Sequence, residues 1–208
     1  NISVKIITLY AHSVAYRSAT QFGFTNVVEE LNKTVDLRHY TPKTLFREKL
    51  VTEDSYINLI DGQRRSYEFP NPAAVGCFLS HMKICNQNDL TLVLEEDAVF
   101  SKSLHSQLEH AIKLVKNKKA SIIIFGPSRV FEGLFPWQKP FIPYNYKNRF
   151  ERLGTRGFWG THGVLYSSKG CTDLNSIFRG PKNMQIDSAI SYFSQKSILK
   201  DVWIEVNE

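Results

Sequence analysis

Short apolar runs alternate along the chain with longer segments in which apolar residues recur every three or four positions. The runs are rich in β-branched residues and leucine, so they predict strands over residues 4–9, 90–94, 121–125, 163–166 and 199–206. The periodic segments predict helices over residues 14–31, 73–88, 103–118, 168–178 and 186–194. Strands that alternate with helices predict an α/β fold whose central sheet is mostly parallel and covered on both faces.

Two long segments fit neither pattern. Residues 33–72 are polar and irregular, whereas residues 126–160 hold four of the eight prolines and many aromatic residues. A long aromatic loop inside a compact domain is usually functional, so residues 126–160 are a candidate functional loop or lid. Trp137 and Trp159 in this loop offer flat aromatic faces to a ligand, and a role as core residues explains them equally well. The length of 208 residues fits one domain over residues 1–208.

An acidic turn closes the strand predicted at residues 90–94. Glu95, Glu96 and Asp97 follow it directly, and buried acids that repel each other need a cation or hydrogen-bond donors. Side chains alternate along an extended chain, so Glu95 and Asp97 point the same way and are candidate ligands of one divalent cation. The alternative is a solvated acidic turn that caps the next helix.

Two histidine motifs are further candidates. Cys77, His81 and Cys85 recur four residues apart and share one helix face, which raises a zinc site; a structural, hydrogen-bonding face is favoured, because a fourth zinc ligand is missing. His81 is expected off the apolar face formed by Val75, Leu79 and Met82.

The second histidine motif places His162 between Gly160 and Gly163, just before a predicted strand. Glycines allow close backbone approach to a ligand, so His162 is a candidate ligand of a metal or a phosphate; a plain turn is the alternative. Asp187 lies at a predicted helix start, where Asp is favoured for capping reasons alone.

The composition narrows the class of ligand. A net charge of +6 and a pI of about 9.2 suit a phosphate-bearing ligand, a nucleic acid or an anionic membrane surface. The basic residues are scattered and no nucleic-acid motif is present, so we expect no nucleic-acid partner. No apolar run approaches the roughly 20 residues that span a bilayer. Three cysteines are a sparse set that indicates a reducing compartment.

Together these motifs resemble glycosyltransferase family 25, the sugar transferases of lipopolysaccharide and lipooligosaccharide synthesis. The resemblance covers roughly residues 2–195 and rests on four segments in matching order: residues 76–81 (GCFLSH), 92–98 (LVLEEDA), 160–167 (GTHGVLYS) and Asp187. The chain departs from the family pattern at Thr8, where the family has Asn, at Glu96, the middle acid of the triplet, and at Gln185-Ile186, which precede the final acid.

The resemblance implies a GT-A-like, Rossmann-type nucleotide-diphospho-sugar transferase fold and an inverting transfer of a hexose, most commonly galactose, from a UDP-sugar to a saccharide acceptor. It implies a divalent cation, with Mn²⁺ favoured over Mg²⁺, held by Glu95, Asp97 and His162. Arg17, Ser80, His81, Glu95, Glu96 and His162 are the expected contacts to the donor or its metal loop, and Asp187 is the expected catalytic base.

The acceptor implied by the family is lipooligosaccharide or another oligosaccharide. Residues 126–160 would then be the acceptor region, where Trp137 or Trp159 would stack on a sugar ring. The expected location is the bacterial cytoplasm, with peripheral contact to the inner membrane. Two other functions stay open on the sequence: a metal-dependent phosphohydrolase, which would also use clustered acids, and a non-catalytic carbohydrate-binding protein built on a transferase fold.

Overall fold

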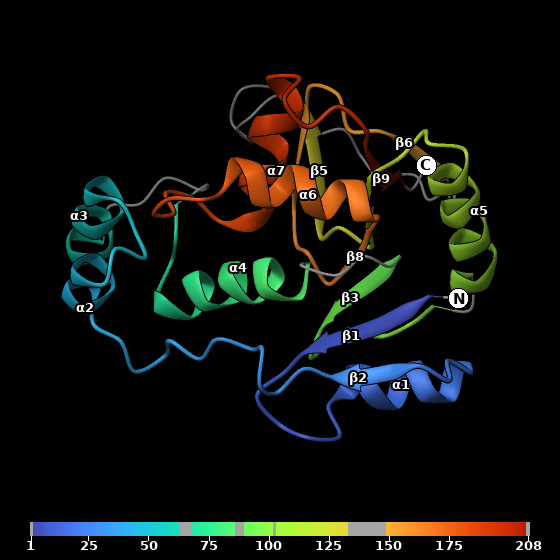
Figure 1. Cartoon of the computed structure of the whole chain (residues 1–208), viewed down its shortest axis with the longest axis horizontal. Helices are drawn as coiled ribbons and strands as arrows, with labels where there is room; N and C mark the ends of the chain where they lie inside the picture. Colours follow the sequence, from blue (N-terminus) through green and yellow to red (C-terminus); the bar gives the residue numbers. More distant parts are fainter. Residues whose placement is uncertain (1, 63–67, 86–89, 102, 133–148, 207–208) are drawn as a thin grey trace.

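The computed structural model describes residues 2–62, 68–85, 90–101, 103–132 and 149–206. The helices are α1 (Val14–Phe22), α2 (Pro42–Arg47), α3 (Glu53–Asp61), α4 (Pro72–Ile84), α5 (Leu104–Lys116), α6 (Ser168–Ile177) and α7 (Ile186–Gln195) (Figure 1). The strands are β1 (Ser3–Ile7), β2 (Val27–Glu29), β3 (Thr91–Glu95), β4 (Ile122–Phe125), β5 (Arg129–Glu132), β6 (Arg149–Arg152), β7 (Arg156–Trp159), β8 (Gly163–Tyr166) and β9 (Val202–Val206).

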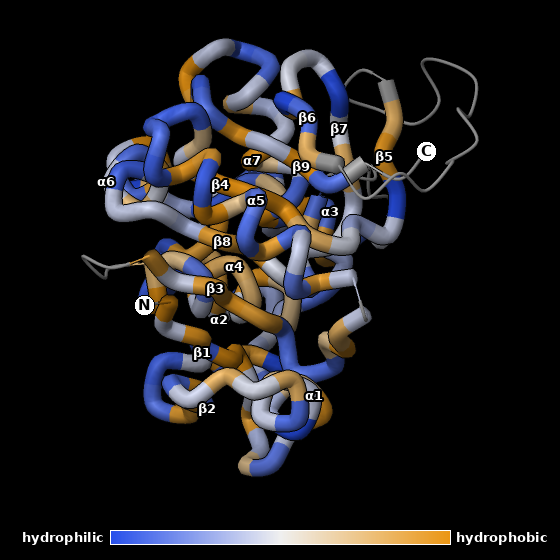
Figure 2. Tube along the Cα trace, turned by 90° about the vertical axis from the view of Figure 1, so that its right-hand side faces the viewer, coloured by the Kyte–Doolittle hydropathy of each residue, from blue (hydrophilic) through white to orange (hydrophobic). Residues whose placement is uncertain are grey.

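A seven-stranded sheet in the order β2-β1-β3-β8-β4-β9-β6 forms the centre of the molecule, and Figure 2 shows these strands following one another in that order. β1 pairs in parallel with β2 and β3, and β4 pairs in parallel with β9. β8 runs antiparallel to both β3 and β4, and β6 runs antiparallel to β9. Five of the seven strands therefore point the same way. The predicted α/β fold with a mostly parallel sheet is confirmed, and the arrangement is compatible with a Rossmann-like fold.

Helices cover both faces of the sheet, as expected. One apolar cluster joins α4, α6 and α7 to one face, and a second joins α1 and α5 to the other. β8 contributes to both clusters, because Val164 packs into the first and its neighbour Leu165 into the second. Alternate side chains of a strand point to opposite faces, so this central strand ties the two halves of the core together. Among the described residues, no helix combines the length and apolar character needed to cross a membrane.

The helix predicted over residues 14–31 is wrong in its second half. α1 ends at Phe22 because Gly23 adopts a left-handed conformation with φ of 101°, and its backbone N–H caps the carbonyls of Ala19 and Thr20. The chain then forms β2, the short parallel strand at the edge of the sheet.

Residues 33–72 are not irregular throughout, because they contain α2 and α3. Thr41 caps the first turn of α2 by accepting the N–H of Thr44, and Pro42 begins the helix. Thr52 caps α3 in the same way by accepting the N–H of Ser55. These caps are the local signals for the two helices, which pack against each other at one end of the molecule (Figure 1).

The predicted loop at 126–160 contains strands on both sides of residues 133–148. β5 and β7 form a two-stranded antiparallel sheet, while β6 joins the edge of the main sheet beside β9. Trp137 and the rest of 133–148 lie outside the described residues. Trp159 is half-buried at the end of β7, where its ring contacts that of Phe131 at 5.6 Å and lies under the Arg129 guanidinium.

Candidate functional site

The acidic turn lies at the carboxyl edge of the sheet, as expected. β3 ends at Glu95, and the pairing of Leu94 with Gly163 on β8 brings the next residue, His162, beside Glu95. The backbone N–H of Glu95 donates to the carbonyl of His162 at 3.1 Å, which extends the ladder by one step. The antiparallel register of β3 and β8 therefore places these two side chains together.

Glu95, Asp97 and His162 form a cluster in which one potential ligand atom of each lies within 4.8 Å of the others. Nδ1 of His162 lies 3.8 Å from Glu95 Oε2 and 3.6 Å from Asp97 Oδ1. The other ring nitrogen, Nε2, is 3.1 Å from the hydroxyl of Ser128, so the ring is held with Nδ1 toward the acids. Two carboxylates and an imidazole suit Mn²⁺ or Mg²⁺ and leave coordination positions for phosphate oxygens and water.

Gly160 is required by the backbone that positions His162. It has a φ of 90°, and an added Cβ would lie 2.7 Å from Ser128 Oγ and 3.2 Å from His162 Nε2. A side chain here would strain the backbone and displace the ring. The sequence predicted that the glycines of this motif allow a ligand to approach the backbone. At Gly160 the groups that approach closely are the side chains of Ser128 and His162.

The second oxygen of Glu95 faces inward. Oε1 accepts a hydrogen bond from the Thr161 hydroxyl at 2.5 Å and lies 3.6 Å from His81 Nε2 and 3.7 Å from the Cys77 sulfur. Burial raises the pKa of Glu95, but His81, Thr161 and His162 outweigh burial and lower it to about 2. Glu95 therefore carries its negative charge at every physiological pH.

His81 is fully buried, although it lies off the helix face formed by Val75, Leu79 and Met82. The reason is that α4 buries most of its circumference, including Phe78, Ser80 and Ile84, between the sheet and α6. Nδ1 of His81 lies 3.0 Å from the hydroxyl of Tyr166, a pair that no local sequence pattern indicates.

The Cys77–His81–Cys85 face does not converge on one point. Cys77 and His81 turn toward Glu95 and form a second three-residue cluster with it, whose potential ligand atoms lie within 4.8 Å of one another. Cys85 is buried elsewhere, where its pKa is raised by burial and by its hydrogen bond with Cys171. Burial and then the nearby Glu95 carboxylate raise the pKa of Cys77, so its thiol is protonated in the metal-free protein.

Ser80 stabilises the wall of the site. Its hydroxyl donates to the carbonyl of Gly76 and accepts the N–H of Val35, both at 2.8 Å. The segment after β2 is thereby fixed to α4.

Of the two other residues expected to contact the donor, Glu96 lies beside the acidic turn and Arg17 does not. Glu96 is exposed beside the turn and accepts a hydrogen bond from Thr8 at 3.3 Å. Arg17 is exposed on α1 and lines neither of the two cavities that flank the acidic turn. The basic residue that does reach the site is Arg38, which is paired with Asp36 at 2.8 Å.

Two cavities flank the acidic turn. The smaller, of about 290 Å³, is lined by residues that follow β1 and β3, with Ser80, Cys77 and Arg38 opposite them. The larger, of about 490 Å³, lies toward α5 and is lined by Phe100, Leu104, Phe125, His162 and Glu205, among others. Asp97 lines both cavities.

The smaller cavity occupies the topological switch point of the sheet. From β1 the chain passes to β2 on one side and later returns to β3 on the other side of β1. In open α/β sheets the crevice at such a point, beyond the carboxyl ends of the strands, is where ligands bind.

The amino end of α1 is already filled by a carboxylate. Glu29 accepts the N–H groups of His12 and Ser13, both at 2.8 Å, and the Ser13 hydroxyl at the same distance. Burial raises the pKa of Glu29, but these hydrogen bonds outweigh it and the pKa is lowered. A ligand phosphate would therefore meet a negative charge at this helix end, where Rossmann dinucleotide-binding proteins hold their pyrophosphate.

Asp187 lies in the first turn of α7 and is nearly buried, with 9% of its surface exposed. One oxygen accepts the N–H of Gly160 at 3.1 Å and the other accepts the N–H of Ser188. Burial raises its pKa, the hydrogen bonds lower it, and the charge of Glu95 raises it, so that the pKa is raised overall. Asp187 is thus fixed directly to the turn that carries His162.

Two residues of this region escape sequence reasoning. Thr161, within the glycine motif, donates the short bond to Glu95. Glu205, in β9, is a buried acid that accepts hydrogen bonds from Gln107 and from the N–H of Gly126, and burial raises its pKa. The available signal for Glu205 is an acid inside an otherwise apolar strand.

Neither a comparison with models of protein families nor one with curated proteins finds a match to this chain. The function must accordingly be argued from the site itself.

Proposed function

We propose that this chain is a metal-dependent, inverting glycosyltransferase that moves a hexose, with galactose favoured, from a UDP-sugar to a saccharide acceptor. A lipooligosaccharide acceptor in the bacterial cytoplasm follows from the motif resemblance alone. The observation that supports the proposal most is the Glu95–Asp97–His162 cluster beside the cavity at the switch point of the sheet.

The charge pattern favours a cation-bridged diphosphate over direct binding at a helix end. The helix end after β1 is filled by Glu29, and the turn after β3 is acidic. A diphosphate can approach such a turn only with a cation between them. Glu95, Asp97 and His162 would hold that cation, which when bound neutralises the charge that grows on the leaving UDP.

The two cavities fit two substrates. The nucleotide would occupy the smaller cavity at the switch point, and the acceptor the larger cavity, whose Phe100 and Phe125 offer apolar surface to a sugar ring. Asp97 borders both, so the reacting groups would meet beside it. An inverting transfer also needs a base for the acceptor hydroxyl. Asp187 lines neither cavity, and it is our candidate because it accepts the N–H of Gly160 in the turn that carries His162 and because burial raises its pKa.

The test is UDP release from a panel of UDP-sugars with an oligosaccharide acceptor, with EDTA and with added Mn²⁺. We expect release that EDTA abolishes and Mn²⁺ restores. Asp97→Asn should lower turnover by about two orders of magnitude, the scale seen when one charge-stabilising group is removed.

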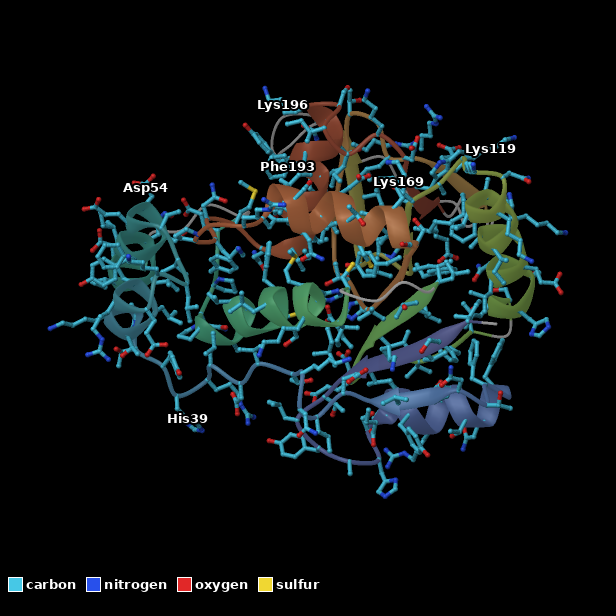
Figure 3. All side chains as sticks on the ribbon, viewed as in Figure 1. His39, Asp54, Lys119, Lys169, Phe193 and Lys196 are labelled. Atoms are coloured by element: carbon cyan, nitrogen blue, oxygen red, sulfur yellow. The ribbon has the colours of Figure 1, made fainter. Side chains whose placement is uncertain are left out.

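The matched control is Asp54→Asn, which removes an exposed carboxylate on α3 (Figure 3). Asp54 lines neither cavity. It should leave UDP release unchanged. UDP release that persists in EDTA would contradict the proposal. Release of free phosphate from simple esters would identify a phosphohydrolase, and sugar binding without UDP release would identify a carbohydrate-binding protein.

A further inference from the structure

A second cluster of potential metal ligands lies behind the first. Cys77 and His81, one turn apart on α4, face Glu95 at the end of β3. The two clusters share Glu95 but use its different oxygens, because Oε1 faces Cys77 and His81 whereas Oε2 faces His162.

The inner cluster contains an unsatisfied buried nitrogen. Among the described residues, Nε2 of His81 has no hydrogen-bond partner, although its side chain is fully buried. Its nearest acidic oxygen, Glu95 Oε1, is 3.6 Å away, which is too long for a good hydrogen bond. The other ring nitrogen already has a partner in the Tyr166 hydroxyl, so Nε2 is fixed in its direction. Buried polar groups in native proteins nearly always have a partner, and a metal ion or a water molecule at this position would supply one.

The two separations that involve Glu95 Oε1 are close to those around a tetrahedral zinc ion. Zn–S bonds of about 2.3 Å and Zn–N and Zn–O bonds of about 2.0–2.1 Å place sulfur and oxygen roughly 3.5 Å apart and nitrogen and oxygen roughly 3.3 Å apart. The observed separations are 3.7 Å for Cys77 Sγ to Glu95 Oε1 and 3.6 Å for His81 Nε2 to the same oxygen. The sulfur and the ring nitrogen lie within 4.8 Å of each other, so the three atoms face one common point.

We propose that Cys77, His81 and Glu95 bind a Zn²⁺ ion, with Glu95 as a carboxylate that bridges this inner site and the outer Glu95–Asp97–His162 site. Thiolate and imidazole ligands select zinc, whereas the acids and imidazole of the outer cluster suit Mn²⁺ or Mg²⁺. The fourth zinc position is left for water. The smaller cavity supplies both the water and an access route, because Cys77, Ser80 and Glu95 line it.

The inner ion has a structural consequence for the outer site. It joins α4 to the end of β3 and fixes the carboxylate plane of Glu95, so that Oε2 is presented toward Asp97 and His162. Groups behind a metal ligand orient it in this way in many metalloproteins.

Co²⁺ titration of the metal-free protein tests the proposal, since a cobalt–thiolate bond gives a charge-transfer absorption in the near ultraviolet. The wild-type chain should develop this absorption and saturate at one thiolate-bound Co²⁺ per chain. Cys77→Ala should lose it, whereas Cys171→Ala, which removes a buried cysteine outside the cluster, should keep it. Asp97→Asn should also keep it, because Asp97 belongs to the outer cluster alone.

A second measurement needs no variant. Zn²⁺ should slow alkylation of Cys77 in the wild-type chain by about tenfold or more, read by mass spectrometry, because a metal-bound thiolate is withheld from the reagent. Absence of the cobalt–thiolate absorption in the wild type, its survival in Cys77→Ala, or unprotected Cys77 in Zn²⁺ would each overturn the proposal. These readouts need neither donor nor turnover, so their failure is separate from a failure of the transferase proposal.

Discussion

At the scale of single residues, the site depends on carboxylates whose environments differ. Glu95 is held ionised by His81, Thr161 and His162, whereas the pKa of Asp187 is raised. A pair of acids separated in this way suits one role as a ligand and another as a base. Glu205, which lines the larger cavity and also has a raised pKa, is the competing candidate for the base.

Asp187→Asn is expected to lower kcat by about 10²–10⁴-fold, the usual contribution of general acid–base catalysis, while UDP still binds. Glu205→Gln should reduce kcat much less. Single-turnover kinetics and UDP titration would separate the two effects. The reverse order of the two variants would assign the base to Glu205, and weakened UDP binding in Asp187→Asn would show that Asp187 only supports the His162 turn.

The buried Glu30 gives a prediction on pH. Its carboxylate lies 3.0 Å from Lys5 and 3.2 Å from Lys33. Burial raises its pKa, but the two lysines outweigh burial, so the pKa is lowered. A lowered folded-state pKa stabilises the protein above the unfolded-state pKa, and this stabilisation is lost as the pH falls through the folded-state value.

Glu30→Gln should therefore lower the free energy of unfolding by about 1–3 kcal/mol at neutral pH, because Lys5 loses its buried partner. The difference from wild type should shrink below about pH 4. Urea unfolding at several pH values measures it. Asp173→Asn, which breaks the exposed pair with Lys169, is the control and should cost about 0–0.5 kcal/mol. An undiminished difference at low pH would contradict the explanation.

At the scale of elements, the position of α4 is set by its small residues. An added Cβ at Gly76 would lie 2.3 Å from the carbonyl oxygen of Val35, a backbone atom that cannot rotate away. Gly76 thus allows α4 to approach the segment after β2, where Ser80 holds Val35 by a hydrogen bond. The close contact brings Cys77 and His81 up to the end of β3.

Gly76→Ala should destabilise the protein by about 1–3 kcal/mol, the usual cost of overpacking, and weaken metal binding. Gly180→Ala is the matched control, since no described atom lies within 4 Å of its added Cβ and its φ is not left-handed. Thermal unfolding followed by circular dichroism compares the two. Equal stability of both variants would show that the Val35 segment yields to the extra methyl group.

The sequence predicted the buried elements well and the peripheral ones poorly. Strands such as β3 and β8 have buried, mostly apolar residues, so their hydrophobic runs revealed them. β2 has three residues at the sheet edge and none fully buried, and α2 and α3 each bury one residue. Such elements carry almost no hydrophobic periodicity, and only their caps indicate them.

The site residues were likewise predictable only where a local sequence pattern marks them. Glu95 and Asp97 were predictable because an acidic turn after a buried strand is visible in the sequence. The proximity of His162 to Glu95 depends on the register of β3 and β8, and that of His81 to Tyr166 on helix packing. Register and packing are set by contacts between residues far apart in the chain, which a single sequence does not show.

At the scale of the whole molecule, one sheet joins two cores and carries the site at a single edge. Ligands at that edge would contact residues from β1, β3, α4 and the turn before β8, so their binding energy should stabilise the entire fold. A ligand at a hundredfold its dissociation constant stabilises the folded state by about 2.7 kcal/mol.

Mn²⁺ and UDP together are therefore expected to raise the Tm by roughly 5–10 °C, and UDP in EDTA by much less. Differential scanning fluorimetry measures the shift. Asp97→Asn should lose it and Asp54→Asn should keep it. An equal increase in Tm with UDP in the presence and in the absence of Mn²⁺ would indicate that the nucleotide binds without the cation.

The position of Asp97 between the two cavities has a kinetic consequence. If the transferase proposal holds, the first molecule to bind would alter the charge that the second encounters, because the exposed carboxylate of Asp97 lines both cavities. A cation and a nucleotide bound first would neutralise the Asp97 carboxylate. A neutral sugar that enters from the α5 side would then avoid the cost of desolvating an unpaired anion. Binding should then be sequential, with the nucleotide preceding the sugar and departing after it.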